Sequence, residues 1–343
     1  MSKDPHSRNL SFDVMNIFAC MAVVFMHHNA HVYNYDSRPG WIFSLAVDCL
    51  FYWAVPVFLM ISGANLMDYH RKYSTKEFLA KRFRRTFLPW LIWSILILAW
   101  KIRTEQFVPE GSGLGYYLTL LLTNQADSTF WFFTTLFTCY LMLPVLTRLT
   151  SYESTLWYMV ITVFILSSVL PFFRTLFGFQ QRLVTSLHEP MILYFLLGYL
   201  LSRKPLKKGH RLALYAAGVL GTLFRFLYTL HFSVQNQALD TSIKSYTQWF
   251  AVFLSAAVFV FFRQVPWERI LPPAIQKMLP RIASCSFGIY LSHKIVMYYH
   301  HLLFPISRSG MEWKTIRFLL TYLVTLTVIS LLRKIPIVGK YLC

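Results

Sequence analysis

The chain alternates between long apolar runs and short polar loops. Most of the runs approach the roughly 20 residues that an α-helix needs to cross a bilayer. They lie at about 11–31, 44–67, 86–104, 128–148, 155–173, 188–202, 211–231, 246–263, 283–304 and 315–332. A weaker apolar piece at 116–122 is too short to span and predicts a re-entrant or interfacial segment. The pattern therefore predicts an all-α, polytopic membrane bundle of about ten transmembrane helices.

The composition supports this prediction. Of the 343 residues, 56% are hydrophobic and 14% are charged, whereas an ordinary globular domain has about 25% charged residues. Little of the chain is therefore left for a water-soluble domain. No repeat, low-complexity tract or long linker divides the sequence, so we expect a single transmembrane domain over residues 1–343.

The net charge of +19 is placed in the loops between the runs. Lysine and arginine are concentrated at 71–85, 203–211, 263–281 and 333–340. With ten spans these clusters fall on one side, which the positive-inside rule identifies as the cytoplasm. We therefore expect both termini in the cytoplasm, and membrane lipid rather than nucleic acid as the partner of the positive charge.

The first run carries a polar stripe that an ordinary membrane helix lacks. Asn16 and His27 are eleven residues apart, which on an α-helix is about three turns, roughly 16 Å of rise and nearly the same azimuth. Asp13 lies within about 40° of the same face. Polar groups in hydrocarbon face protein or a water-filled cavity and indicate a functional site by default. We take His27, Asn16 and Asp13 as the catalytic candidates.

His27 is the strongest of these candidates. Imidazole is the side chain best suited to proton transfer near neutral pH, so His27 predicts a general base. The alternative is a histidine that only bonds a neighbouring helix or lies at the membrane interface. A metal site is not indicated, because His31 one turn later is accompanied by no HExxH motif and no third ligand.

A basic cluster, Lys81-Arg82-Phe83-Arg84-Arg85, precedes the third run. Such residues usually anchor a helix by the positive-inside rule. The density of this cluster favours a binding role in addition, because Arg82 and Arg85 share a helix face and could hold phosphates with their planar guanidinium groups. We therefore expect Arg82, Arg85 and Arg84 to bind a cytosolic donor that bears phosphates, such as a nucleotide or coenzyme A.

Isolated polar residues complete the candidates. Glu189 lies at the outer end of the sixth run, and Arg225 lies well inside the seventh. An arginine at that depth needs a partner or water, and the sequence does not identify one. His293 lies about halfway through the ninth run, close to Tyr290, and Trp131 belongs to an aromatic stretch in the fourth run.

Taken in order, these motifs resemble the membrane acyltransferase 3 family. The first span of that family carries an arginine, an alanine, paired valines and a histidine, which are matched by Asn16, Ala19, Val23, Val24 and His27, with asparagine in place of arginine. The later matching motifs are Pro56-Val57-Phe58 with Ser62-Gly63, Arg82-x-x-Arg85 with Leu88-Pro89, Trp131-Phe132 with Tyr140 and Pro144, Tyr194 to Tyr199, and Ile289-Tyr290-Leu291-x-His293. Each motif is loose, but the ordered set covers nearly the whole chain.

The resemblance implies an enzyme that moves an acyl group, acetyl above all, from cytosolic acyl-coenzyme A to a hydroxyl of a surface glycan or lipid-linked sugar. In type the chain is similar to the enterobacterial-common-antigen O-acetyltransferase, which implies a multi-pass protein of a bacterial inner membrane. Acetyl-coenzyme A is then the donor substrate at Arg82, Arg84 and Arg85, and His27 is the base. No metal is implied, and a homo-oligomer is left open.

One residue departs from the family pattern. The amide of Asn16 can form hydrogen bonds but cannot supply the positive charge of the family's arginine. Binding of the donor would then rely on another cation, for which Arg82, Arg84, Arg85 and Arg225 are the candidates.

A transporter or flippase for a glycan or small metabolite is the alternative function. Ten spans, a polar stripe and the intramembrane Arg225 also fit a substrate pathway. Use of an acyl donor separates the two functions, because a transporter should neither bind nor release coenzyme A.

Overall fold

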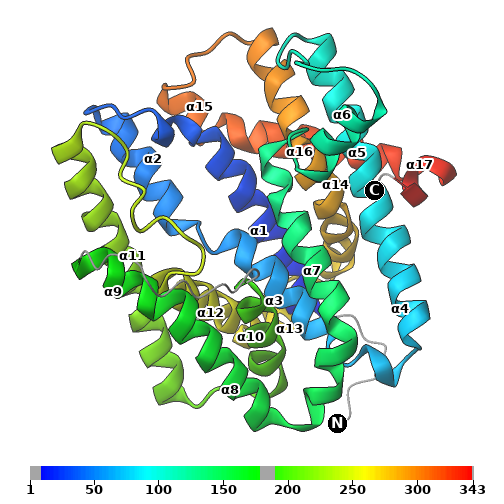
Figure 1. Ribbon diagram of the computed structural model, residues 1–343, viewed down its shortest axis with the longest axis vertical. Helices are drawn as coiled ribbons and strands as arrows, with labels where there is room; N and C mark the ends of the chain where they lie inside the picture. Colours follow the sequence, from blue (N-terminus) through cyan, green and yellow to red (C-terminus); the bar gives the residue numbers. More distant parts are fainter. Residues whose placement is uncertain (1–8, 178–189, 342–343) are drawn as a thin grey trace.

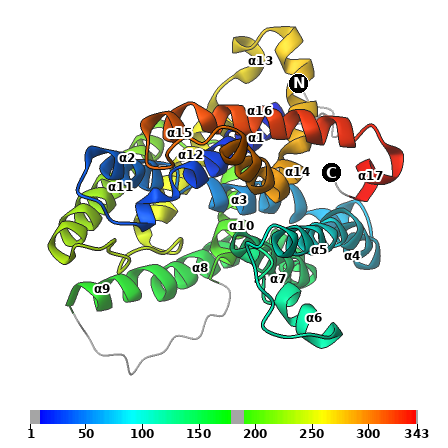
Figure 2. The same ribbon diagram turned by 90° about the horizontal axis from the view of Figure 1, so that it is seen from above.

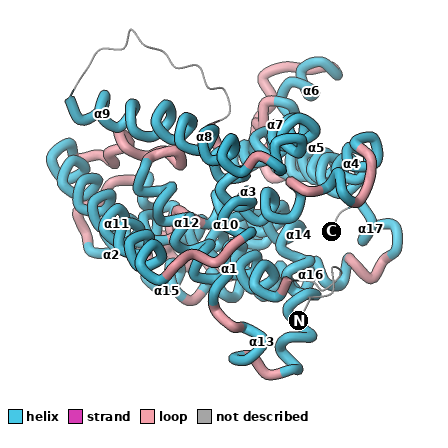
Figure 3. The backbone as a smooth tube through the Cα atoms, turned by 90° about the horizontal axis from the view of Figure 1, so that it is seen from below, coloured by secondary structure: helices cyan, strands magenta, loops and turns pink. Residues whose placement is uncertain are grey.

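We describe the protein from a computed structural model, in which residues 9–177 and 190–341 are described (Figure 1). These residues form helices and connecting loops and contain no β-strand (Figure 3). The prediction of an all-α chain is thereby confirmed.

The helices follow one another with short connections. They are α1 (Leu10–His28), α2 (Pro39–Leu50), α3 (Ala54–Leu66), α4 (Thr75–Arg82), α5 (Leu88–Arg103), α6 (Leu114–Leu122), α7 (Trp131–Leu146), α8 (Glu153–Phe164), α9 (Leu170–Phe177), α10 (Ile192–Arg203), α11 (Lys208–Asn236), α12 (Trp249–Gln264), α13 (Trp267–Ile270), α14 (Pro273–Leu303), α15 (Met311–Thr315), α16 (Arg317–Leu332) and α17 (Pro336–Tyr341). Two π-helical turns, Phe83–Phe87 and Ile165–Val169, join α4 to α5 and α8 to α9.

Helix α1 lies at the centre of the bundle, against α3, α12, α14 and α16 (Figure 1). Its side chains Met15, Ala19, Cys20 and Val24 are fully buried. Asn9 caps the first turn, because its side chain accepts a hydrogen bond of 3.0 Å from the N–H of Ser11. Because α1 is central, its polar side chains lie against other helices.

The predicted run 44–67 is two helices, α2 and α3, instead of one. Pro56 favours the interruption, because it has no N–H to donate to the carbonyl of Tyr52 and its ring would clash with that carbonyl in a continuous helix. The chain turns at 51–53 before α3 begins. This turn places Tyr52 in the wall of the cavity described below.

Helices α3 and α10 are in close backbone contact. A Cβ atom on Gly63 would overlap the carbonyl oxygen of Phe195, and one on Gly198 would overlap that of Met60. Small residues allow such close approach between membrane helices. The Ser62-Gly63 motif of the sequence therefore serves helix packing here.

Replacing Gly198 with alanine is expected to destabilise the protein by about 1–3 kcal/mol, because the added methyl group forces α3 and α10 apart. The measurement is the thermal unfolding midpoint of the full chain in detergent. Gly115→Ala is the matched control, since no atom lies within 4 Å of a Cβ at Gly115. Equal midpoints for the two variants would contradict the close packing of α3 on α10.

Several helical stretches are long and apolar enough to cross a membrane. By length and composition, the described residues contain six of them: Leu10–His28, Pro39–Arg71, Thr75–Arg103, Ser128–Ser151, Glu153–Phe177 and Lys208–Asn236. The shorter α10, α12 and α16 are also apolar. The protein is therefore a multi-pass membrane protein. A described helix overlaps each of the ten predicted runs, but the count of ten and the side of the termini stay predictions.

The apolar piece at 116–122 lies in the short helix α6, which projects from the bundle (Figure 2). Leu120 and Leu121 are buried against Leu98 of α5. A helix of 9 residues is too short to span a bilayer. A re-entrant or interfacial position of α6 stays a prediction.

Candidate functional site

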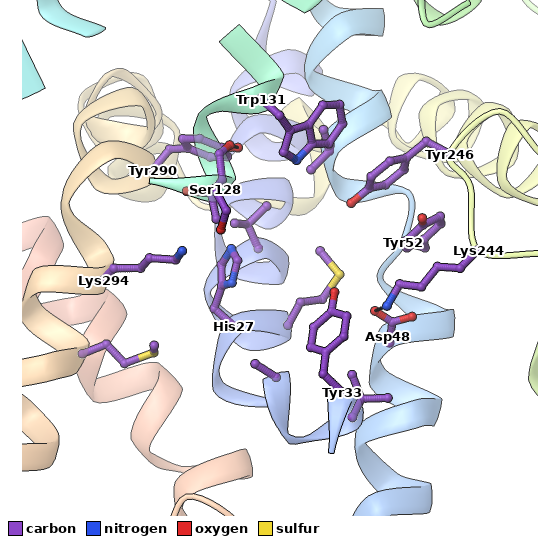
Figure 4. Close-up of a pocket in the computed structure, with 17 residues that line it drawn as sticks. His27, Tyr33, Asp48, Tyr52, Ser128, Trp131, Lys244, Tyr246, Tyr290 and Lys294 are labelled. Atoms are coloured by element: carbon purple, nitrogen blue, oxygen red, sulfur yellow. Dashed lines mark hydrogen bonds and ion pairs between the residues drawn. The ribbon is translucent and has the colours of Figure 1, made fainter. Parts of the chain in front are cut away.

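A cavity of about 450 Å³ lies between α1, α2, α14, the start of α7 and the loop before α12 (Figure 4). This volume is usual for a small-molecule site. His27, near the end of α1, is half-buried in its wall, and its ring points into the cavity between Lys294 and Tyr33 (Figure 4). We call this space the His27 cavity.

His293 on α14 faces His27, with the two ring centroids 5.0 Å apart. Nδ1 of His293 lies 2.8 Å from the carbonyl oxygen of Tyr290. Since a carbonyl oxygen only accepts, Nδ1 carries the proton, and Nε2 of the neutral ring keeps a lone pair. Nε2 is buried and has no hydrogen-bond partner among the described residues. The structure thus brings together His27 and His293 from distant parts of the chain. Nε2 of His293 is an acceptor that no described donor uses.

An ion cluster borders the His27 cavity on the α14 side. Nζ of Lys294 lies 2.7 Å from Oδ1 of Asp127, and Nζ of Lys101 lies 3.2 Å from Oδ2. Burial alone would raise the pKa of Asp127, but the two ammonium groups hold that pKa below its usual range. The carboxylate therefore stays ionised and fixes Lys294, whose ammonium points toward His27 (Figure 4).

A second ion cluster borders the cavity on the α2 side and supplies the partner of Arg225. Nη2 of Arg225 lies 2.5 Å from Oδ2 of Asp48, and Nζ of Lys244 lies 3.2 Å from Oδ1. The guanidinium also lies over Tyr52, 3.7 Å from the ring centroid. Arg225 is 3% exposed, whereas Asp48 and Lys244 line the cavity. The deep arginine is thus paired, as its place in an apolar helix requires.

Aromatic rings form the cavity wall near Lys244. Tyr52 and Tyr246 stack with centroids 4.1 Å apart, and Trp131 packs on Tyr246 at 5.3 Å. Together with Lys244, these three residues also line an open hollow of about 540 Å³. The His27 cavity therefore shares a wall with an open hollow.

A second cavity, of about 210 Å³, lies deeper along α1. Its polar lining residues are Asn16, Ser62, Thr86, Tyr140, Ser286 and Tyr290, and we call it the Asn16 cavity. Tyr290 lines both cavities, and its hydroxyl donates to the carbonyl oxygen of Thr129 at 2.8 Å. Tyr290 is therefore a shared wall between the two spaces.

Arg82 lies close to the far end of the Asn16 cavity. Its guanidinium is 5.7 Å from the ring centroid of Tyr140, and its Nε is buried without a hydrogen-bond partner in the described part of the chain. Arg84 and Arg85 are exposed. A π-helical turn begins at Phe83, between Arg82 and Arg85, and it has more residues per turn than an α-helix. The shared face of Arg82 and Arg85 stays a prediction.

The predicted polar stripe of α1 is divided between the two cavities. His27 lines one cavity and Asn16 the other. Nδ2 of Asn16 donates to the carbonyl oxygen of Ala283 at 3.1 Å. Asp13 is buried and lines neither cavity. Glu189 lies outside the described residues.

Three charged residues of the site, Asp48, Lys244 and Lys294, are not among those that the sequence pattern singles out. Asp48 could have been found from the sequence. A carboxylate alone within an apolar run is costly, and so is an arginine such as Arg225, so two opposite charges of this kind indicate an ion pair. Lys294 carried a similar signal, since it directly follows His293 within the ninth run. Lys244 lies in a loop and carried none.

Comparison with known proteins gives the class of the molecule. No curated protein and no solved structure matches the chain. Residues 9–333 match the acyltransferase 3 family, whose description is "Acyltransferase domain". The match includes every residue that lines the two cavities. The chain therefore belongs to the acyltransferase 3 family and is a membrane acyltransferase.

Proposed function

We propose that this protein is an O-acetyltransferase, which moves an acetyl group from cytosolic acetyl-coenzyme A to a hydroxyl of a surface glycan or lipid-linked sugar at a bacterial inner membrane. The observation that carries the proposal is the shared wall at Tyr290. One of the two spaces contains His27 and the other leads to Arg82. A donor bound at Arg82 and an acceptor bound beside His27 would meet within the bundle.

The donor would enter at the basic end. Arg82, with the exposed Arg84 and Arg85 beside it, supplies positive charge for the phosphates of coenzyme A. The Asn16 cavity has no charged lining residue, which suits an uncharged pantetheine arm. In this arrangement the thioester reaches His27 past Tyr290.

The proposed reaction is a single acetyl transfer. The acceptor hydroxyl oxygen attacks the carbonyl carbon of the thioester, and His27 takes the hydroxyl proton as the carbon–oxygen bond forms. The carbon–sulfur bond then breaks, and the imidazolium returns the proton to the leaving thiolate. The products are an acetyl ester and coenzyme A with a free thiol.

Two neighbours of His27 support this step. Lys294, held by Asp127 at 2.7 Å, is in place to stabilise the negative charge that develops on the thioester oxygen. We assign His293 a positioning role, because its Nε2 offers an acceptor for the N–H of the neutral His27 ring. That hydrogen bond would fix the tautomer that leaves the other nitrogen of His27 free as the base.

Replacing Arg82 with alanine is expected to raise the KM for acetyl-coenzyme A about tenfold or more, because a hydrogen bond to a charged group contributes about 1.5–3 kcal/mol. The measurement is the release of free thiol by the purified full chain as a function of acetyl-coenzyme A concentration. The rate at saturating donor should change less than the KM.

Arg148→Ala is the matched control, because Arg148 is an exposed arginine just beyond the end of α7. If Arg82→Ala and Arg148→Ala both keep the KM of the unmodified protein, Arg82 is a helix anchor and does not bind the donor. If the unmodified protein releases no thiol with any glycan acceptor, acyl-coenzyme A is not its donor.

A further inference from the structure

The His27 cavity lies between two ion clusters of the same net charge. In each cluster one carboxylate is held by two cations. Asp48 lies between Arg225 and Lys244, and Asp127 lies between Lys101 and Lys294. In both clusters a lysine is the cation that lines the cavity.

Each cluster therefore carries one more positive charge than negative. Asp48 is the one carboxylate among the described residues that line the cavity. A surplus charge on buried or half-buried groups is costly unless an anion or water compensates it. Since Lys244 and Lys294 line a cavity with the volume of a small-molecule site, the surplus favours a ligand that brings its own negative charge.

Lys244 is the better placed of the two lysines to bind such a ligand. It lines both the His27 cavity and the open hollow, so it lies where the two spaces meet. Its ammonium is 4.2 Å from the ring centroid of Tyr33, and Trp131 and Tyr246 line the same two spaces. Lys294, in contrast, is directed toward His27 (Figure 4).

We propose that the acceptor is an anionic sugar, whose carboxylate or phosphate binds Lys244 while one of its hydroxyl groups reaches His27. This inference rests on the proposed function, and it names the class of acceptor. A carboxylate would belong to the sugar itself, and a phosphate to the link between a sugar and its lipid.

The inference can be tested with a variant of Lys244 that is expected to stay folded. Removing the charge of Lys244 leaves Asp48 paired with Arg225 at 2.5 Å. No buried carboxylate is then left unpaired, so Lys244→Met should keep its thermal unfolding midpoint. If Lys244 only paired with Asp48, Lys244→Met would also leave the binding of anions unchanged.

The experiment measures binding of three probes to the full chain in detergent by isothermal titration. The probes are D-glucuronate, D-glucose 6-phosphate and D-glucose, which differ at the sixth carbon. We expect at least one anion to bind ten times more tightly than glucose, and Lys244→Met to lose that preference. Lys72→Met, at an exposed position, is the matched control and should bind as the unmodified protein does.

The other results would overturn the inference. These are equal or absent binding of all three probes, unchanged anion preference in Lys244→Met, and loss of the preference in Lys294→Met alone. A preference for glucuronate supports a sugar carboxylate, and one for glucose 6-phosphate supports a phosphate.

Thiol release from acetyl-coenzyme A, measured on the same samples, separates this inference from the proposed function. Thiol release without anion preference overturns the anionic acceptor alone. Anion binding without thiol release for any acceptor overturns the acetyl transfer and leaves the anion site in place.

Discussion

Replacing His27 with alanine is expected to lower the rate of acetyl transfer by about 10²–10⁴-fold, which is the usual contribution of a general base. The loss should appear in kcat, because His27 and Arg82 lie at different cavities and donor binding does not depend on the imidazole. The measurement is the initial rate of thiol release with the acceptor at saturating acetyl-coenzyme A.

Two further variants sharpen this test. His27→Gln keeps a side chain of similar size that cannot take up a proton near neutral pH, so it should be as slow as His27→Ala. His210→Ala removes an exposed histidine at the start of α11 and should leave the rate unchanged. A rate for His27→Ala within a few-fold of the unmodified protein would remove His27 from the chemistry.

His293 gives a different signature if it positions His27. Since it would not itself take the acceptor proton, His293→Gln should keep part of the activity that His27→Gln loses. The glutamine oxygen can accept the N–H of His27 in place of Nε2, whereas the alanine variant cannot. Partial rescue by glutamine over alanine at position 293 therefore distinguishes positioning from packing.

The helical fold could be predicted from the sequence because the length and hydrophobicity of each run are local properties. The division of run 44–67 into α2 and α3 was not predicted, although Pro56 lies within it. A proline in a membrane helix permits either a kink or a break. Packing of α2 and α3 against different neighbours decides between the two, and local sequence does not encode that packing.

The site could be predicted only in part. His27 was identifiable, because an ionisable group on a buried membrane helix is costly unless it has a function. The pairing of the candidates was not, since the contacts of His27 with His293 and of Asp48 with Arg225 join residues far apart in the sequence. Which residues face each other across two helices depends on their relative rotation and height, and a single sequence does not specify these.

The position of Asn16 changes how the missing arginine is understood. Asn16 lines a different cavity from His27 and lies about three turns below it. A positive charge at position 16 would therefore lie along the proposed donor path and away from the reacting carbonyl. Lys294 is the cation directed toward His27 (Figure 4), so in the proposed mechanism the asparagine would affect binding of the donor more than the transfer step.

Replacing Asp48 with alanine is expected to destabilise the protein by about 3–5 kcal/mol, because the buried guanidinium of Arg225 is left without its carboxylate. Arg225→Met should cost less, since Asp48 keeps Lys244 at 3.2 Å. The double variant Asp48→Ala/Arg225→Met should recover part of the loss, because it leaves no unpaired charge on the buried side of the cluster. The measurement is the free energy of unfolding of each variant in detergent.

A surface ion pair provides the control for this comparison. Glu77 and Lys81 lie 2.7 Å apart on α4, and the Glu77 side chain is 52% exposed. Exposed pairs contribute about 0–1 kcal/mol, so Glu77→Ala should be nearly neutral. Two results would contradict the prediction: Asp48→Ala costs no more stability than Glu77→Ala, or the double variant is less stable than Asp48→Ala. Either would mean that Asp48 does not stabilise the buried charge of Arg225. We expect the unequal cost of removing Asp48 and Arg225 because one carboxylate serves two cations. The same arrangement leaves the charge of Lys244 only partly compensated, as binding of an anionic ligand requires.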